Sequence, residues 1–268
     1  MNRLEMQDII KERVPLLIEQ HQDEWKEYEK LRQAFVRDYP IDQIRNLTLD
    51  EYVNGKGESN RSFCYRLEYQ LRGLGDISGS PCTQYGVWFG HYGKDSTVDY
   101  QFTKKNGSNV NEAFQNVKDL IVDVLSKYDD MEALNQNILP AKLKGKILFL
   151  YHPDIYLNIF SKNHLAFFIA HLNILTTSDE ELDLQKTLME YRATWPELQN
   201  ASPFLYGTFL YDQFGHPPKD TSQQIPLLST ALAGARVNTT KKTAQPTRQN
   251  PDYEELQRNR KIIGDRGE

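Results

Sequence analysis

The stretch YGVWFGHYGKDSTVDYQFT, residues 85–103, decides the fold class. Tyr85, Val87 and Phe89 lie two residues apart, so in a β-strand their side chains share one face, and Trp88 lies on the opposite face. Gly93, Lys94 and Asp95 then favour a turn, and the aromatic residues Tyr100 and Phe102 follow it. The stretch therefore predicts an antiparallel hairpin with aromatic side chains on both faces.

Other runs extend the predicted β-structure. Residues 93–95 form the hairpin turn, and residues 98–103 return as the second strand. Residues 61–71 alternate loosely and are predicted to belong to the same sheet region. Residues 146–151 and 156–160, separated by His-Pro-Asp, predict a second hairpin. The predicted fold class is α+β: a small, mostly antiparallel sheet of two hairpins packed with several helices.

Helical patterns occupy most of the remaining chain. Residues 3–38 predict one long helix, because apolar residues recur at helical spacing between charged ones. Pro15 predicts a kink or a division of this helix. Thr48 and Glu51 form a T-x-x-E capping box, which predicts the start of a short helix. Further helices are predicted at residues 111–128, through the 160s after a Ser161 cap, at 182–191, and at 203–214 after Ser202.

The composition along the chain predicts three parts. Residues 1–214 form one α+β domain with residues 1–38 as its helical lead-in. Residues 215–250 are rich in Thr, Gln, Pro and Lys and predict a flexible linker. Residues 251–268 predict the first helix of a second domain that is cut at residue 268. We therefore expect the chain to be the N-terminal part of a larger protein.

Composition and charge exclude several classes of protein. The N-terminus lacks the features of a signal peptide, and the longest apolar run is too short to span a bilayer. The two cysteines, Cys64 and Cys82, suit a reducing compartment. We expect a cytoplasmic protein without membrane contact. The net charge of −5 means that any nucleic-acid contact must be local.

Motifs for catalysis and for cofactors are missing from the sequence. There is no phosphate-binding glycine loop, no H-E-x-x-H and no G-x-S-x-G, and the six histidines are scattered. We predict no catalytic residues, no metal site and no cofactor in this chain. Whether the protein is an enzyme stays open, since a nuclease or NTPase activity would lie in a further C-terminal part.

The segment from residue 61 to residue 105 carries the candidate binding residues. It holds six basic residues against four acidic ones, interleaved with aromatic residues. Basic groups grip phosphates and aromatic rings stack on bases, so this mixture indicates a nucleic-acid surface. The alternative interpretation is that the aromatic residues form core and the basic ones are merely solvated. The predicted nucleic-acid-binding residues are Arg61, Arg66, Trp88, Tyr92, Lys94, Lys104 and Lys105.

Three stretches also resemble a known family. They are residues 35–90, with LTLDEY and FCYRLEYQLRGLGDISGS, residues 143–174, with LKGKILFLY and NIFS, and residues 202–214, ending LYDQF. Their order and content resemble the N-terminal domain of McrB-like restriction and defence proteins, over about residues 34–214. The sequence departs from the family pattern at Asp76 and at Ser78-Gly79-Ser80. The resemblance implies a module that reads DNA, often with modified bases, ahead of an AAA+ motor.

The C-terminal stretch DYEELQRNRKIIGDRGE, residues 252–268, resembles the entry to a NO VEIN C-terminal domain. This second resemblance implies a nuclease-like domain downstream.

Three hypotheses follow from the sequence. The first is a DNA-recognition module of a bacterial restriction or antiphage defence protein, with a nuclease or motor subunit as partner. The second is a protein-interaction or phage-sensor module without DNA binding, which the acidic balance and the long N-terminal helix favour. The third is an enzyme whose nuclease centre lies beyond residue 268.

Overall fold

The computed structural model of the chain describes residues 3–56, 61–78, 82–91 and 97–218. All of these residues belong to one structural unit, Met1–Ala231. The predicted hairpin turn, with Tyr92 and Lys94, lies outside the described residues. So do most of the predicted linker and the whole of the predicted helix 251–268.

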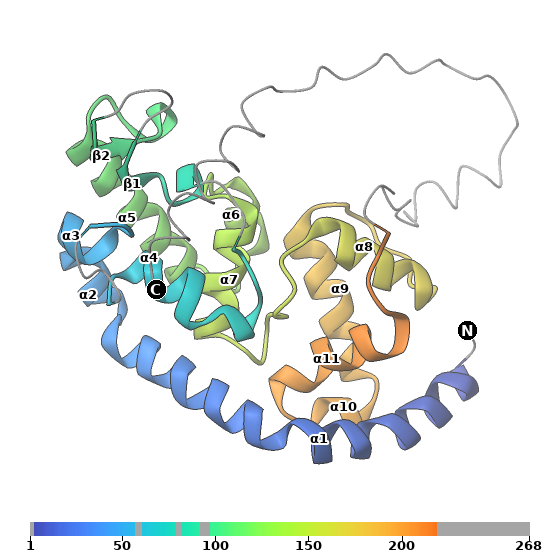
Figure 1. Cartoon of the computed structure of the whole chain (residues 1–268). Helices are drawn as coiled ribbons and strands as arrows, with labels where there is room; N and C mark the ends of the chain where they lie inside the picture. The colour runs from blue at the N-terminus through green and yellow to red at the C-terminus, as the bar shows by residue number, and fades with distance from the viewer. Residues whose placement is uncertain (1–2, 57–60, 79–81, 92–96, 219–268) are drawn as a thin grey trace, which may run out of the picture. The chain divides into compact units, whose positions relative to one another are not determined.

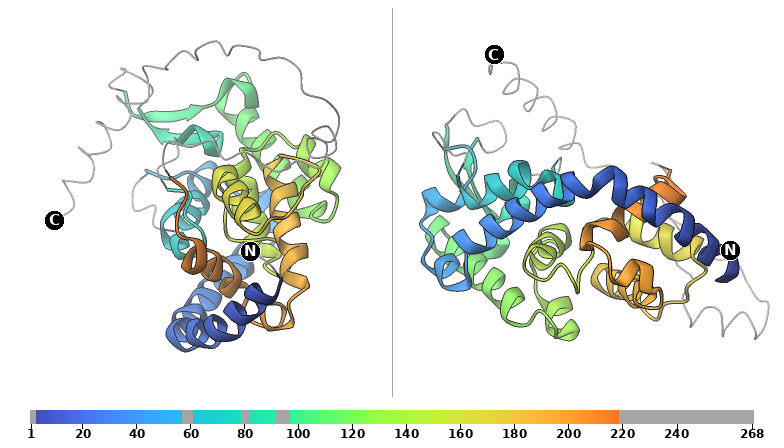
Figure 2. Two further views of the ribbon diagram at one scale, coloured as in Figure 1. Left: turned by 90° about the vertical axis from the view of Figure 1, so that its right-hand side faces the viewer. Right: turned by 90° about the horizontal axis from the view of Figure 1, so that it is seen from below.

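The described residues form a mostly helical unit with one two-stranded sheet (Figures 1 and 2). This arrangement confirms the predicted α+β class. The elements are α1 (Arg3–Asp38), α2 (Ile41–Asn46), α3 (Leu49–Tyr52), α4 (Phe63–Tyr65), the π-helical turn η1 (Arg66–Gln70), the 3-10 turns η2 (Arg72–Leu74) and η3 (Cys82–Tyr85), β1 (Val87–Gly90), β2 (Asp99–Phe102), the 3-10 turn η4 (Lys104–Asn106), α5 (Val110–Ser126), α6 (Met131–Gln136), α7 (Ala141–Tyr151), α8 (Lys162–His171), α9 (Glu181–Ala193), α10 (Pro196–Gln199) and α11 (Pro203–Phe214).

Helix α1 runs along one side of the unit, from α10 and α11 to α2 (Figure 1). Arg13 in its first half forms an ion pair with Asp212 of α11 at 2.6 Å, and Arg32 in its second half donates to the carbonyl of Leu150 in α7 at 2.7 Å. The prediction of one long helix is confirmed, and the helix continues through Pro15. Pro15 is exposed, so water can solvate the carbonyl that loses its helical hydrogen bond.

The short helix α3 begins with the predicted capping box. The Thr48 hydroxyl accepts from the backbone N–H of Glu51 at 3.3 Å, and the Glu51 carboxylate accepts from the backbone N–H of Thr48 at 2.9 Å. The box satisfies two backbone donors that a helix start leaves free. It also orients Asp50, which lies in the first turn of this helix.

Removing this cap provides a first test of the fold. We expect Thr48→Ala to lower the free energy of unfolding by about 1 kcal/mol, because the backbone N–H of Glu51 loses its side-chain acceptor. Urea unfolding followed by circular dichroism measures the effect. Thr48→Ser keeps the hydroxyl and should stay within about 0.5 kcal/mol of the parent. Equal losses in the two variants would contradict the role of the cap.

The sheet consists of β1 and β2, paired antiparallel with Val87 opposite Phe102 and Phe89 opposite Tyr100. The predicted first hairpin is thereby confirmed over its described residues. The predicted second hairpin is wrong: residues 146–151 belong to α7, and residues 156–160 form no strand. Residues 143–150 are all buried, and the apolar run of residues 147–150 fits a buried helix as well as a buried strand.

The segment of residues 61–71 is also helical, not extended as predicted. The hydroxyl of Ser62 caps it by accepting from the backbone N–H of Tyr65 at 3.3 Å. Phe63, Leu67 and Leu71 follow at a spacing of four residues, and all three are buried. Tertiary packing therefore uses the helical period of this segment and not its loose alternation.

The predicted helices in the second half of the chain are confirmed as α5, α8, α9 and α11. Ser202 caps α11 by accepting from the backbone N–H of Phe204 at 3.3 Å. Ser161 lies at the N-cap of α8, but its side chain makes no capping hydrogen bond there. Across the part of the chain that the structure describes, no helix is long and apolar enough to cross a membrane.

The core below the sheet is aromatic. Phe35 of α1 lies 5.4 Å from Phe63 of α4, Tyr52 of α3 stacks on Phe63 at 5.7 Å, and Tyr52 contacts Phe114 of α5 at 5.3 Å, all between ring centroids. The Tyr52 hydroxyl donates to the carbonyl of Tyr85 at 2.7 Å, just before β1. This chain of rings anchors the base of the hairpin to four helices.

Candidate functional site

The β1–β2 hairpin presents one aromatic face. Paired residues lie on the same side of an antiparallel sheet, so Val87, Phe89, Tyr100 and Phe102 share this face. Val87 is buried at the base, whereas Phe89 and Tyr100 are half-buried further out. Their ring centroids lie 5.2 Å apart in an edge-to-face arrangement. The hairpin therefore carries a rigid, partly exposed aromatic pair.

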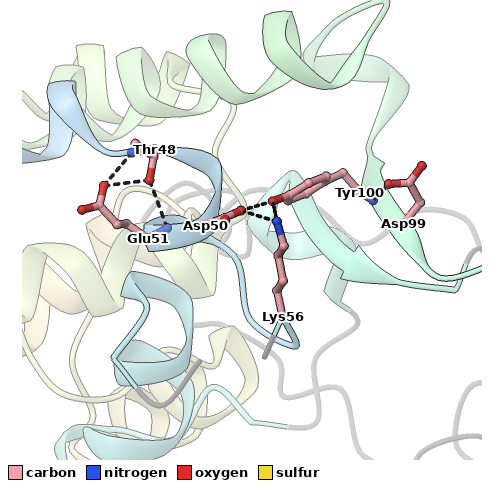
Figure 3. A network of polar contacts seen from close by, with 6 residues as sticks. All are labelled: Thr48, Asp50, Glu51, Lys56, Asp99 and Tyr100. Carbon is pink, nitrogen blue, oxygen red and sulfur yellow. Dashed lines mark hydrogen bonds and ion pairs between the residues drawn. The ribbon is translucent and has the colours of Figure 1, made fainter. Parts of the chain in front are cut away.

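A polar network fixes this pair in place (Figure 3). The Lys56 ammonium donates to Asp50 at 2.8 Å and to the Tyr100 hydroxyl, and that hydroxyl donates to Asp50. Lys56 also lies over both rings, 4.6 Å from the centroid of Tyr100 and 5.7 Å from that of Phe89. We call Asp50, Lys56, Phe89 and Tyr100 the hairpin cluster.

Asp50 and Lys56 are not among the residues that the sequence predicts to bind a ligand. Lys56 lies in an Asn-Gly-Lys-Gly turn and Asp50 in the capping-box helix, 44 and 50 residues from Tyr100. Only the folded chain brings them together. Gly55 allows the turn that carries Lys56 to pack against β1. Its φ of +94° and its approach to the carbonyl of Phe89 leave no room for a side chain.

Three of the predicted binding residues are exposed cations. Lys104 and Lys105 lie in η4, directly after β2, and neither forms an ion pair with another described residue. The side chain of Arg61 is also exposed, while its carbonyl accepts from the Tyr39 hydroxyl at 2.7 Å. Lys104 and Lys105 thus lie in the turn that follows the strand carrying Tyr100.

Arg66 lies in a different environment. Its residue is only 9% exposed, and its guanidinium donates to Asp38 at 2.8 Å and to Gln70 at 2.6 Å. It also lies 5.3 Å from the ring centroids of Phe35 and Tyr39. All of these contacts are internal, so Arg66 joins α1 to η1 and has no exposed face with which to grip a phosphate.

Trp88 is opposite the aromatic face, as the alternation predicts, but it does not point into solvent. It pairs with Gln101 and is only 5% exposed. Trp88 is therefore buried, and the partly exposed aromatic surface of the hairpin is the Phe89–Tyr100 face. Tyr92 and Lys94 lie outside the described residues.

Burial keeps the titratable side chains beneath the hairpin neutral. Within the described ranges no group of three or more His, Cys, Asp or Glu side chains is placed to hold a metal ion. Burial raises the pKa of the Cys64 thiol well above its usual value, which suppresses the reactive thiolate. Burial likewise raises the pKa of Tyr52 and Tyr85 beneath the hairpin. These groups stay neutral and support the surface from below.

The fold and this surface define a class: a helical α+β domain with one anchored hairpin among its described residues, which presents partly exposed aromatic rings and is followed by a turn with two exposed lysines. No protein-family model matches the chain, and no curated protein or solved structure matches it either.

Proposed function

We propose that residues 1–214 form a DNA-recognition module of a cytoplasmic bacterial restriction or antiphage defence protein, and that the hairpin is its contact surface. One observation carries this proposal. Lys104 and Lys105 are exposed and unpaired among the described residues, and they directly follow the strand that bears the partly exposed ring of Tyr100. The sequence resemblance to McrB-like proteins supports the same function.

Electrostatics explains how an acidic chain can bind DNA here. The net charge of −5 opposes non-specific binding over the whole molecule. Lysines that are free of ion pairs can instead neutralise phosphates locally and release counterions. Lys56 is already paired with Asp50, so it contributes less charge and serves to orient the rings. Binding through this surface should be weak without a matching base contact.

The aromatic pair provides that base contact. Stacking on a ring stabilises an unpaired base by about 1–3 kcal/mol and tolerates any base identity. Phe89 and Tyr100 are held edge-to-face at 5.2 Å, so one ring can stack while the other borders the base. A flipped or unpaired base, including a modified one, is the ligand that this geometry favours.

Removal of the exposed lysines tests the proposal. We expect the double variant Lys104→Ala/Lys105→Ala to bind duplex DNA roughly tenfold more weakly and to lower the slope of log affinity against log salt by about 2, since two phosphate contacts are lost. Fluorescence anisotropy of the full chain with plain and modified duplexes, across a range of salt concentrations, measures both effects.

The matched control is Lys26→Ala/Lys30→Ala on α1. These lysines are also exposed, but they pair with Asp23 and Glu27 of their own helix. The control changes net charge equally and should keep the parental slope. Equal losses in both double variants, or no salt-dependent binding by the parent, would overturn the proposal. The second outcome would favour a protein-interaction or phage-sensor module.

A further inference from the structure

The helical stretch formed by α4, η1 and η2 presents a second aromatic surface, outside the hairpin. Its inner side consists of Phe63, Leu67 and Leu71, which are all buried. Tyr65 and Tyr69 are on the outer side: Tyr65 is half-buried, and Tyr69 is 45% exposed. The stretch is therefore amphipathic, but its outer side carries aromatic rings where a solvated helix usually carries charged groups.

The two tyrosines form a pair on a fixed backbone. Their ring centroids lie 5.0 Å apart with an angle of 40° between the ring planes. The backbone N–H of Leu71 donates to the carbonyl of Arg66 at 2.9 Å, five residues back, which makes the turn between the two a π turn. Such turns are rare and are frequently found at functional sites. Tyr69 lies within this turn, so the local backbone also favours a functional role for its ring.

An exposed arginine lies on either side of the tyrosine pair in the chain. Arg61 directly precedes the Ser62 cap, and its side chain forms no ion pair with a described residue. Arg72 follows Tyr69 by three residues, about one helical turn. Its Nε donates to Asp76 at 3.0 Å, but its two terminal amino groups form no hydrogen bond with a described residue. We call Arg61, Tyr65, Tyr69 and Arg72 the tyrosine face.

The outward charge of this stretch is positive, although the whole chain is acidic. Residues 61–72 hold three arginines and one acidic residue, Glu68, which is only 3% exposed. The ion pair of Arg72 with Asp76 is exposed on both sides, and such pairs contribute little. A phosphate can therefore compete with Asp76 for Arg72, and an anionic ligand fits the tyrosine face better than a cationic one.

The tyrosine face and the hairpin share an anchor. The ring of Tyr52 stacks on Phe63, at the start of the stretch, with 5.7 Å between centroids. The hydroxyl of the same Tyr52 donates to the carbonyl of Tyr85 at 2.7 Å, just before β1. One buried side chain thus holds both surfaces, so a ligand bound at the hairpin lies on the same rigid base as the tyrosine face.

We propose that the tyrosine face binds single-stranded DNA, with Tyr69 stacking on a base and with Arg61 and Arg72 contacting phosphates. In a duplex the faces of each base are covered by its neighbours, so an exposed ring can stack only on an unpaired base. The guanidinium fork matches the geometry of a phosphate. This assignment rests on the proposed function and narrows its substrate to DNA that contains a single-stranded stretch.

Fluorescence anisotropy of the full chain with a labelled oligothymidylate tests this binding mode, because thymine bases do not pair with one another. We expect the parent to bind it and Tyr69→Ala to bind roughly tenfold more weakly, the effect of losing one stacked base. Tyr69→Phe should keep the parental affinity, since the ring alone is sufficient for stacking. Circular dichroism checks that each variant is folded.

Ile155→Ala is the matched control for Tyr69→Ala. Ile155 lies outside the tyrosine face and is 45% exposed, the same fraction as Tyr69. Its loss removes exposed apolar surface and should leave the affinity for oligothymidylate unchanged. Equal losses in Tyr69→Ala and Ile155→Ala would overturn the proposal. So would an unchanged affinity in Tyr69→Ala, which would instead favour a protein partner for this surface.

The two arginines are tested through the salt dependence of the same binding. Arg61→Gln/Arg72→Gln should lower the slope of log affinity against log salt by about 1.4, since each phosphate contact with a single strand contributes about 0.7. Lys26→Ala/Lys30→Ala removes the same net charge from α1 and should keep the slope. An unchanged slope in the arginine variant would contradict the phosphate contacts.

Duplex DNA separates this proposal from the one for the hairpin. Lys104→Ala/Lys105→Ala should weaken binding to a plain duplex, whereas Tyr69→Ala should leave that binding unchanged, because the duplex offers its ring no unpaired base. A parent that binds duplex through Lys104 and Lys105 but does not bind oligothymidylate would overturn the tyrosine face alone. A parent that binds neither ligand at low salt would overturn both proposals.

Discussion

Gly75→Ala is expected to destabilise the protein by roughly 3–5 kcal/mol, the sum of backbone strain and a steric clash. Gly75 ends η2 with a φ of +102°, a conformation that residues with a Cβ rarely adopt. An added Cβ would lie 2.3 Å from the ring of Phe160 and 2.7 Å from the carbonyl oxygen of Asn158. Neither atom can retreat easily, because the ring is buried and the oxygen is backbone.

The same substitution would disturb a buried lysine. Lys146 is 0% exposed and donates to the carbonyls of Leu71 and Gly75 at 2.6 and 2.7 Å. Burial lowers the pKa of Lys146 to about 7, against the opposing effect of Asp76, and the two carbonyls are the hydrogen-bond acceptors of its buried amine. A shift of Gly75 would weaken one of them, which adds to the cost of the substitution.

Gly215→Ala is the control that separates strain from collision. Gly215 also has a positive φ, +72°, but a Cβ there would meet no atom within 4 Å. We expect a loss of about 1 kcal/mol from strain alone. Thermal and urea unfolding of both variants measure the difference. Similar losses at the two glycines would contradict the predicted clash with Phe160.

Arg66→Ala is expected to destabilise the protein by about 2–3 kcal/mol and to leave the salt dependence of DNA binding unchanged. The substitution removes the ion pair with Asp38, the hydrogen bond to Gln70 and the contacts with two aromatic rings. Asp38 is 43% exposed, so water can solvate its carboxylate after the loss, which keeps the cost below that of a fully buried pair.

Arg61→Ala provides the matched control for Arg66. Arg61 is exposed, and only its backbone carbonyl takes part in a described hydrogen bond. Its removal should change stability by less than about 0.5 kcal/mol. DNA binding should be compared at a temperature at which both variants are folded. A large drop in the slope of log DNA affinity against log salt for Arg66→Ala, without loss of stability, would indicate that Arg66 contacts DNA.

The sequence predicts those elements whose signals are local. The capping box of Thr48 and Glu51, the cap at Ser202 and the long helix α1 depend on neighbours within a few residues, and the structure confirms all three. The β1–β2 hairpin belongs to the same group, since alternation and a turn lie within one short stretch. Helix-forming spacing and turn chemistry are short-range effects, so one sequence suffices to recognise them.

Burial on all sides defeats this kind of prediction. Residues 146–151 appear extended in the sequence because the apolar run 147–150 shows no polar face, and residues 61–71 because their apolar residues alternate loosely. Both segments are helical. Periodicity reports which side of an element meets water. A fully enclosed element has no such side, and its conformation is decided by what packs around it.

The candidate sites divide in the same way. Composition pointed to the basic and aromatic segment, and Lys104 and Lys105 are indeed exposed there. Composition could not show that Arg66 and Trp88 are buried, or that Lys56 and Asp50 form hydrogen bonds with Tyr100. The sequence by itself determined the local elements and the kinds of side chain available, since these follow from short-range chemistry. Only the tertiary structure decided which charges are internal, which are exposed and which distant residues share a site, because burial depends on packing between segments far apart in the chain.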